Sequence, residues 1–426
     1  MISFCKKLWR DKRGNALMIA GAALPLVVGA AGLATDTIQW TLWKRQLQRA
    51  ADSAAIAGVY NREKAAGSTS TVSNTVDHDL TLNLHTWMTL KTGYPQLVYP
   101  ANTATMTNQV QVTLAIQQQL SFSSLFLTSP PTIIARATAA SIPAGGNACV
   151  QALESNASYT GITNSGNTTI DMPDCVMYSN SPSANSASAG GSSNVTAKAI
   201  AAVGGIAQSN NWHVQSYIPY SPPLADPFAG VTPDPNEMNC TTSALQWNTN
   251  FNNLPAGTNC FSSLSVGSNK TLNIPANFGP IYINGGNVDL QGQFNCTGCT
   301  IVLTNKSTSP TATIGTVSSN AQATNNITAP TSGTFKGIAF YQDRRAPDCS
   351  SCNKLNGGSN SLITGALYFP SEELWYNGGT GAVSTCTMVV ARRITFTGNS
   401  KFKDLAQCSG EGLPSSSTVK MVRLVA

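Results

Sequence analysis

The stretch GNALMIAGAALPLVVGAAGLAT (residues 14–35) decides the first part of the fold. It carries no charge over 22 residues, and about 20 apolar residues are enough to cross a bilayer, so we predict one transmembrane helix. A cleaved signal peptide is the alternative, but its apolar core is usually shorter. The basic residues that precede the stretch are Lys6, Lys7, Arg10, Lys12 and Arg13. By the positive-inside rule we expect a cytoplasmic N-terminus, with residues 36–426 on the other side.

An apolar stripe extends the predicted helix to about Val59. Its members recur at alternating spacings of three and four, which is the pattern of one helix face. The candidate helix-interface residues on this face are Trp40, Trp43, Leu47, Ala50 and Ala54, followed by Ala57. Such a face packs either on the protein's own domain or on the helix of a neighbouring subunit, and periodicity alone leaves both alternatives open.

Residues 10–59 resemble the N-terminal segment of TadE/TadG-like proteins of the tight-adherence (Flp) pilus system. The resemblance rests on a basic start that ends at Gly14, an apolar span with a central Pro25, and the run QLQRAADSAAIAG (residues 46–58) after Asp36. It implies an anchored protein of the bacterial inner membrane that works in pilus assembly. The implied partners are other pilus-assembly or secretion-platform proteins, including TadE/TadF-like pseudopilins.

Two departures from the pilin pattern refine this expectation. Pilin-type processing cuts after a glycine and prefers a glutamate five residues into the mature chain, but the fifth residue after Gly14 is Ile19. We therefore expect the chain to stay unprocessed and anchored, as in the TadG-like branch. The sequence lacks a DxSxS metal-adhesion loop, so we expect no von Willebrand A-like domain.

The net charge of +6 is concentrated at the N-terminus. Residues 1–60 hold eight Lys/Arg and three Asp/Glu, whereas residues 61–426 hold seventeen and sixteen. The part outside the membrane is nearly neutral, so it has no basic surface for a phosphate backbone and we predict no nucleic-acid partner.

The pattern predicts an α+β fold in four parts. A cytoplasmic basic segment (1–13) precedes the transmembrane and extended helix (14–60). Residues 61–148 read as a small pseudopilin-like α/β domain, with a helix near 72–91, period-two strands at 109–116 and 132–139, and a linker at 141–147. Residues 149–426 read as a disulfide-bonded all-β domain.

Short alternating runs separated by Gly, Asn and Ser turns fill the region after residue 149. Their irregular spacing favours a parallel β-helix (β-solenoid), with a β-sandwich as the rival fold. The Pro-rich stretch 218–236 interrupts them. We expect it to form a long loop or lid, or the seam between two halves of the solenoid, because proline cannot donate to a sheet ladder.

Ten of the eleven cysteines follow the predicted span, and an even number in an oxidising compartment indicates five disulfides. Neighbours in the chain are the simplest pairs: Cys149–Cys175, Cys240–Cys260, Cys296–Cys299, Cys349–Cys352 and Cys386–Cys408. The two CxxC units could instead bind zinc or act in redox chemistry. Periplasmic export and the surrounding turn residues favour structural disulfides.

The sequence contains no GxSxG, HExxH, Walker A or Rossmann glycine pattern, and His78, His85 and His213 are scattered. We therefore predict no enzyme activity, metal or cofactor. Many parallel β-helix proteins cleave polysaccharides with grouped carboxylates, so the alternative is an anchored protein that binds or cleaves carbohydrate. Its best candidate cluster is residues 341–348 (YQDRRAPD) with Glu372 and Glu373, although ordinary surface ion pairs explain it as well.

Overall fold

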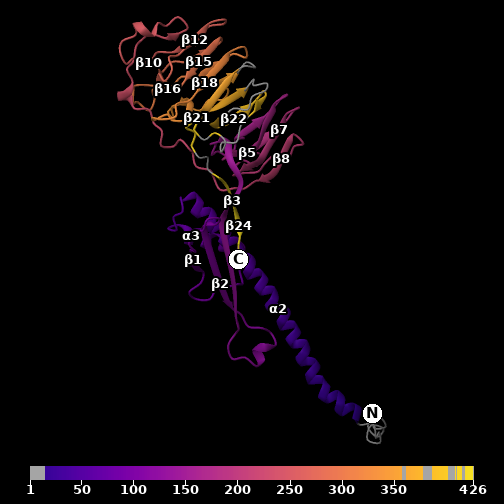
Figure 1. The fold of residues 1–426 in the computed structure, drawn as a ribbon. Coiled ribbons are helices and arrows are strands. Elements are labelled where there is room, and N and C mark those ends of the chain that lie inside the picture. Colours follow the sequence, from indigo (N-terminus) through magenta and orange to yellow (C-terminus); the bar gives the residue numbers. More distant parts are fainter. Residues whose placement is uncertain are drawn as a thin grey trace. The chain divides into compact units, whose positions relative to one another are not determined.

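A computed structural model describes residues 15–356, 361–377, 386–401, 408, 410–414 and 418–425. The basic segment and Cys5 lie outside the described residues. The chain divides into two compact units, Met1–Ile142 with Val422–Ala426 and Pro143–Met421. We call them unit 1 and unit 2 and describe each by itself (Figure 1).

Unit 1 is one long helix with a small sheet on its C-terminal half. Its elements are α2 (Asn15–Lys64), α3 (Val72–Asn83), β1 (Gln96–Val98), β2 (Thr107–Gln117), the 3₁₀ turn η1 (Ser123–Leu125), the first part of β3 (Thr132–Ala152) and the end of β24 (Thr418–Leu424). β2 pairs antiparallel with both β1 and β3. The two period-two runs of the sequence form β2 and β3, as their alternation predicts.

Two local predictions in this part of the chain are wrong in their secondary structure. The helix expected at 72–91 ends at Asn83, because Leu84 takes an extended backbone conformation. The expected linker at 141–147 does contain the boundary between the two units, which falls after Ile142, but its backbone is the middle of the 21-residue strand β3. Gly145 and Gly146 have positive φ angles there, which glycine adopts without steric cost, so the glycines that suggested a linker lie within β3.

Unit 2 is built from parallel ladders of strands. The first ladder contains β10 (Cys260–Phe261), β13 (Gly279–Asn284), β16 (Cys299–Thr304), β19 (Ile338–Gln342), β21 (Leu362–Asn377), β22 (Thr387–Phe396), β3, β5 (Thr169–Ser179), β7 (Asn194–Ala202) and β8 (Trp212–Ile218). The predicted mostly β domain with parallel strands is confirmed.

Two further ladders run beside the first. The second contains β9 (Leu245–Gln246), β11 (Leu264–Val266), β14 (Val288–Leu290), β17 (Val317–Ser319), β20 (Asn353–Asn356), parts of β21 and β22, β4 (Ile162–Asn164) and β6 (Ala187–Ala189). The third contains β12 (Thr271–Asn273), β15 (Gln293–Thr297), β18 (Thr324–Thr328) and part of β21. β23 (Ser400–Lys401) pairs with β5, and η2 (Pro235–Glu237) and η3 (Phe251–Asn253) are short 3₁₀ turns.

The chain joins this stack in its middle rather than at one end. β3 pairs with β5 on one side and with β22 on the other. The chain first adds β5, β7 and β8 toward one end, then crosses to β9 and β10 at the opposite end and returns strand by strand to β22. Pairing of Val150 with Val389 therefore closes the stack between segments more than 200 residues apart.

The Pro-rich segment is the crossing between the two ends, and we call residues 219–238 the strap. It lies over one column of paired residues that includes Tyr178, Gln151, Tyr368, Tyr341 and Tyr282. Tyr178 donates to Pro222 O, and Gln151 donates to Leu224 O. Tyr368 donates to the Asp226 carboxylate, Tyr341 to Val231 O, and Tyr282 to the Glu237 carboxylate. The strap thus follows the stack from strand to strand, and it buries tyrosines that would otherwise face outward.

Arg344 is the main cation that holds the strap. Its guanidinium donates to Phe228 O and to Val231 O (2.7 Å), and it pairs with Asp226 at 3.4 Å.

We expect Arg344→Met to destabilise the strap by about 2 kcal/mol, which is roughly a 30-fold increase in its local opening, because hydrogen bonds from a charged donor are lost. Hydrogen exchange of residues 219–238 in the detergent-solubilised full chain measures this. Lys336→Met at an exposed cation is the control, and equal exchange in both variants would contradict the role of Arg344.

Candidate functional site

The N-terminal half of α2 exposes apolar side chains on every face. Ile19, Leu24, Leu26, Val27, Val28 and Leu33 are each more than half exposed. α2 continues through Pro25 without ending, and it is the one described helix long and apolar enough to cross a membrane. A helix that is apolar all round and uncovered by its own protein is the form that suits lipid.

The C-terminal half of α2 is covered by its own domain. Leu47, Ala50 and Ala54 are fully buried. They pack with Val72, Val76 and Leu80 of α3 and with the inner faces of β2 and β3. The intramolecular alternative therefore accounts for these three stripe residues, and they are not available to a neighbouring subunit.

The two tryptophans of the stripe have different surroundings. Trp43 is half-buried, with its ring 5.9 Å from that of Trp87. Trp40 is 41% exposed, and the neighbouring Ile38 and Leu42 are more exposed still. The surface of α2 that remains for another protein therefore lies at residues 38–42, just after the charge-free stretch.

All five disulfides of the structure join the cysteines that the sequence pairs as neighbours. They are Cys149–Cys175, Cys240–Cys260, Cys296–Cys299, Cys349–Cys352 and Cys386–Cys408. The CxxC sulfurs are thus used in disulfides. Within the described residues no group of three His, Cys, Asp or Glu side chains is arranged to hold a metal ion.

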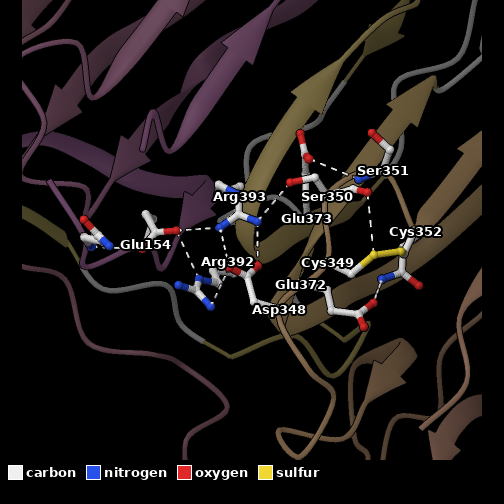
Figure 2. A network of polar contacts seen from close by, with 12 residues as sticks. Glu154, Asp348, Cys349, Ser350, Ser351, Cys352, Glu372, Glu373, Arg392 and Arg393 are labelled. Carbon is white, nitrogen blue, oxygen red and sulfur yellow. Dashed lines mark hydrogen bonds and ion pairs between the residues drawn. A yellow bond between two sulfur atoms is a disulfide. The ribbon is translucent and has the colours of Figure 1, made fainter. Parts of the chain in front are cut away.

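A buried ion-pair network lies where the stack closes. Glu154 follows β3 and is 1% exposed, and its carboxylate accepts from Arg392 (3.0 Å) and Arg393 (2.8 Å) of β22. Asp348, in the β19–β20 connection, pairs with both arginines on their other side, at 3.2 and 2.6 Å. Figure 2 shows Arg392 and Arg393 between the two carboxylates. The network joins the end of β3, the first strand of the stack, to β22, where the returning chain meets β3 again.

The environment of Glu154 favours its ionised form. Burial raises the pKa of the Glu154 carboxyl, but the Asn156 N–H and the guanidiniums of Arg393 and Arg392 outweigh burial and hold it below its usual range. The second oxygen of Glu154 also accepts from the Ser155 N–H. Both oxygens of the Glu154 carboxylate therefore accept hydrogen bonds from other parts of the same chain, and the role of this group is structural.

The carboxylates that suggested a catalytic cluster are dispersed among separate contacts. Asp343 binds Arg345 and Thr304, and Arg344 holds the strap. Glu373 accepts from Thr395 at 2.7 Å and from the Ser351 N–H. Glu372 is 1% exposed and accepts from Gln342 and Asn353. The sequence suggested that these residues form one cluster, but they do not. Sequence analysis did not single out Glu154 and Arg393. The one feature that could have drawn attention to them is that charged residues make up only 10% of the chain.

Glu372 differs from Glu154 because, in the part of the chain that the structure describes, no cation lies beside it. Burial raises the pKa of its carboxyl, the amides of Gln342 and Asn353 lower it, and the Asp348 charge raises it again, so that it stays above the usual range. Since the folded-state pKa of Glu372 is raised, the stability that this group contributes falls as the pH rises from its unfolded-state pKa through its folded-state pKa.

We expect Glu372→Gln to be more stable than wild type at pH 7 and equal to it below about pH 4. Thermal melting across pH measures this, and a variant less stable than wild type at pH 7 would contradict it.

Among the described residues, α2 is thus a helix long and apolar enough to cross a membrane, and a disulfide-bonded, mostly β unit with parallel strands follows it. Residues 14–65 match the family model described as putative Flp pilus-assembly TadE/G-like. The match confirms the resemblance read from the sequence, and it covers all of α2. No curated protein and no solved structure matches the chain.

Proposed function

We propose that this chain is a membrane-anchored, non-enzymatic assembly component of a tight-adherence (Flp-type) pilus or a related secretion system. The observation that carries the proposal is the family match at residues 14–65, because it coincides with the helix whose N-terminal half is apolar and uncovered. The exposed apolar part enters the bilayer, and the buried part fixes the small domain to its outer end.

The same helix gives the proposed location. With α2 crossing the bacterial inner membrane once, the basic residues before Gly14 keep the N-terminus in the cytoplasm. The small domain and unit 2 are then periplasmic. The five disulfides support this side of the membrane, because such bonds persist in oxidising compartments.

We infer that unit 2 is a parallel β-helix whose three ladders are its faces. Strands three apart in the chain pair in parallel, as in β13–β16, β14–β17 and β15–β18. A β-sandwich would be built from antiparallel sheets, whereas every strand pairing among the described residues 143–401 is parallel. In an assembly protein such a stack serves as a rigid, neutral platform for pilus or secretion proteins.

A photo-crosslinking amino acid at position 40 tests the assembly role in intact cells. Trp40 is exposed on α2 just beyond the apolar stretch, where the helices of other anchored proteins would pass. We expect crosslinks to pilus-assembly proteins, including TadE/TadF-like pseudopilins. The control is position 82, because Leu82 is 71% exposed on α3. Crosslinks at position 40 that contain no pilus-machine protein would contradict the proposal.

A carbohydrate-binding role is the second candidate, and one hollow of the surface favours it. It measures about 520 Å³ and includes Tyr217, Tyr220, Gln208 and Asn210. Exposed tyrosine rings beside amide groups can stack on sugars and bond their hydroxyls. Binding of soluble glycan fragments that is lost in Tyr217→Ala would support this role, and no binding by wild type would reject it.

A further inference from the structure

The connection between β2 and β3 carries a second uncovered apolar surface in unit 1. Residues 118–131 (QQLSFSSLFLTSPP) contain no charged residue. Leu125 and Phe126 are each 74% exposed and Leu127 is 52% exposed. Three successive large apolar side chains in water are unfavourable, so this tip indicates a contact with something apolar. We call residues 122–127 the apolar tip.

The apolar tip is fastened to α2 at the end of the charge-free stretch. Asp36 is the first charged residue after that stretch and is only 3% exposed. Its carboxylate accepts from the Phe122 N–H (2.9 Å) and from the N–H and hydroxyl of Ser123. These bonds satisfy the free N–H groups at the start of η1, so the turn is held at a defined position along the helix.

Packing places the same turn beside the apolar part of α2. The Phe122 ring lies on Gly32, where a Cβ atom would collide with it. Gly32 precedes Asp36 by one helical turn and belongs to residues 14–35. The Phe126 ring lies beside the Phe122 ring, with centroids 5.4 Å apart and the ring planes tilted by 57°. Figure 1 shows the β2–β3 connection extending from the sheet alongside α2, toward its N-terminal half.

We propose that the apolar tip inserts into the lipid bilayer beside α2, as a second anchor of unit 1. This inference rests on the proposed membrane anchoring of α2. Lipid is the contact that fits the apolar tip, because the tip lies beside the last apolar turn of the span. The exposed apolar surface of α2 extends to this turn, where Leu33 is 59% exposed. Phenylalanine and leucine side chains that face a bilayer bury themselves at the boundary between the headgroups and the acyl chains, and no charged residue in this connection opposes that.

Site-specific fluorescence quenching tests the insertion. A polarity-sensitive dye is attached to single cysteines introduced by Phe126→Cys, Leu26→Cys or Leu82→Cys, each in a Cys5→Ser full-length chain with its disulfides oxidised. The chains are reconstituted in phosphatidylethanolamine–phosphatidylglycerol vesicles whose acyl chains carry bromine near the glycerol end. Leu26 reports on the span itself. Leu82 matches Phe126 in exposure, 71% against 74%, but belongs to α3.

We expect blue-shifted, bromine-quenched emission at positions 26 and 126 and unquenched emission at position 82. Quenching at position 26 alone would overturn the insertion of the apolar tip while leaving the anchor helix intact. Quenching at none of the three positions would overturn both the tip and the anchor. Quenching at all three would mean that the small domain lies on the membrane without specificity for the tip, and this also contradicts the proposal.

Discussion

Replacing Leu24 and Val27 together by arginine is expected to release the chain from the membrane. Both side chains are 66% exposed near the centre of the apolar stretch, so both guanidiniums would face lipid. Each arginine at the centre of a span costs about 3 kcal/mol, so the pair shifts insertion by roughly 6 kcal/mol, or about 10⁴-fold. Carbonate extraction of cell membranes, followed by blotting of pellet and supernatant, measures the change.

Leu42→Arg is the matched control for this prediction. Leu42 is 52% exposed on the same helix, but it follows Asp36. An arginine there reaches the polar interface, so this variant should stay in the membrane pellet. If the double variant also stayed in the pellet, the apolar stretch of α2 would not be required to hold the chain in the membrane.

Glu154→Gln is expected to lower the melting temperature of unit 2 by roughly 10 °C. The substitution removes the charge that Arg393 faces at 6% exposure, and breaking a buried ion pair costs about 3 kcal/mol at the lower end of measured values. For a domain of this size each kcal/mol lowers the melting temperature by roughly 2–4 °C. Near-ultraviolet circular dichroism of the detergent-solubilised full chain measures the transition.

The dependence of stability on pH below neutrality distinguishes loss of the Glu154 charge from a general weakening of packing. The pKa of Glu154 lies below its usual range in the folded chain. Its stabilising effect is therefore complete above the unfolded-state pKa of about 4.3 and is lost as the pH falls through the folded-state pKa. Wild type and Glu154→Gln should converge on acidification. Asp174→Asn at an exposed carboxylate is the control, and an equal loss in both variants at pH 7 would contradict the role of Glu154.

Local features of the fold could be predicted from the sequence because each depends on a short window. The charge-free length of residues 14–35 is enough to predict a helix that is long and apolar enough to cross a membrane, and α2 is such a helix. Alternation at 109–116 gives the strand β2. Neighbouring cysteines can pair along the chain because successive parallel strands place them close together, as in Cys240–Cys260.

The order of strands in unit 2 could not be predicted, because it depends on distant pairings. No local pattern shows that β3 lies between β5 and β22. The network of Glu154 with Arg393 joins positions 239 residues apart, and each is unremarkable in its own window. The course of the strap could not be predicted for the same reason. Its Pro-rich composition predicts an irregular segment, but not the column of tyrosines on which it lies.

The apolar stripe of α2 shows a second limit of sequence reasoning. Its periodicity identifies a face that must be covered, but not what covers it. α3, β2 and β3 of the same chain cover Leu47, Ala50 and Ala54. Substitutions at these residues would disturb the domain's own core, so tests of partner binding belong at Trp40 and Leu42.

The most direct test of the central claim is the number of surface pili in the bacterium that carries this chain. An in-frame deletion is complemented with wild type or with the Leu24→Arg/Val27→Arg variant, and pili are counted by electron microscopy and by blotting of the sheared fraction. The account predicts that the deletion strain lacks Flp pili, that wild type restores them and that the unanchored variant does not. Unchanged pili in the deletion strain would contradict a role in pilus assembly.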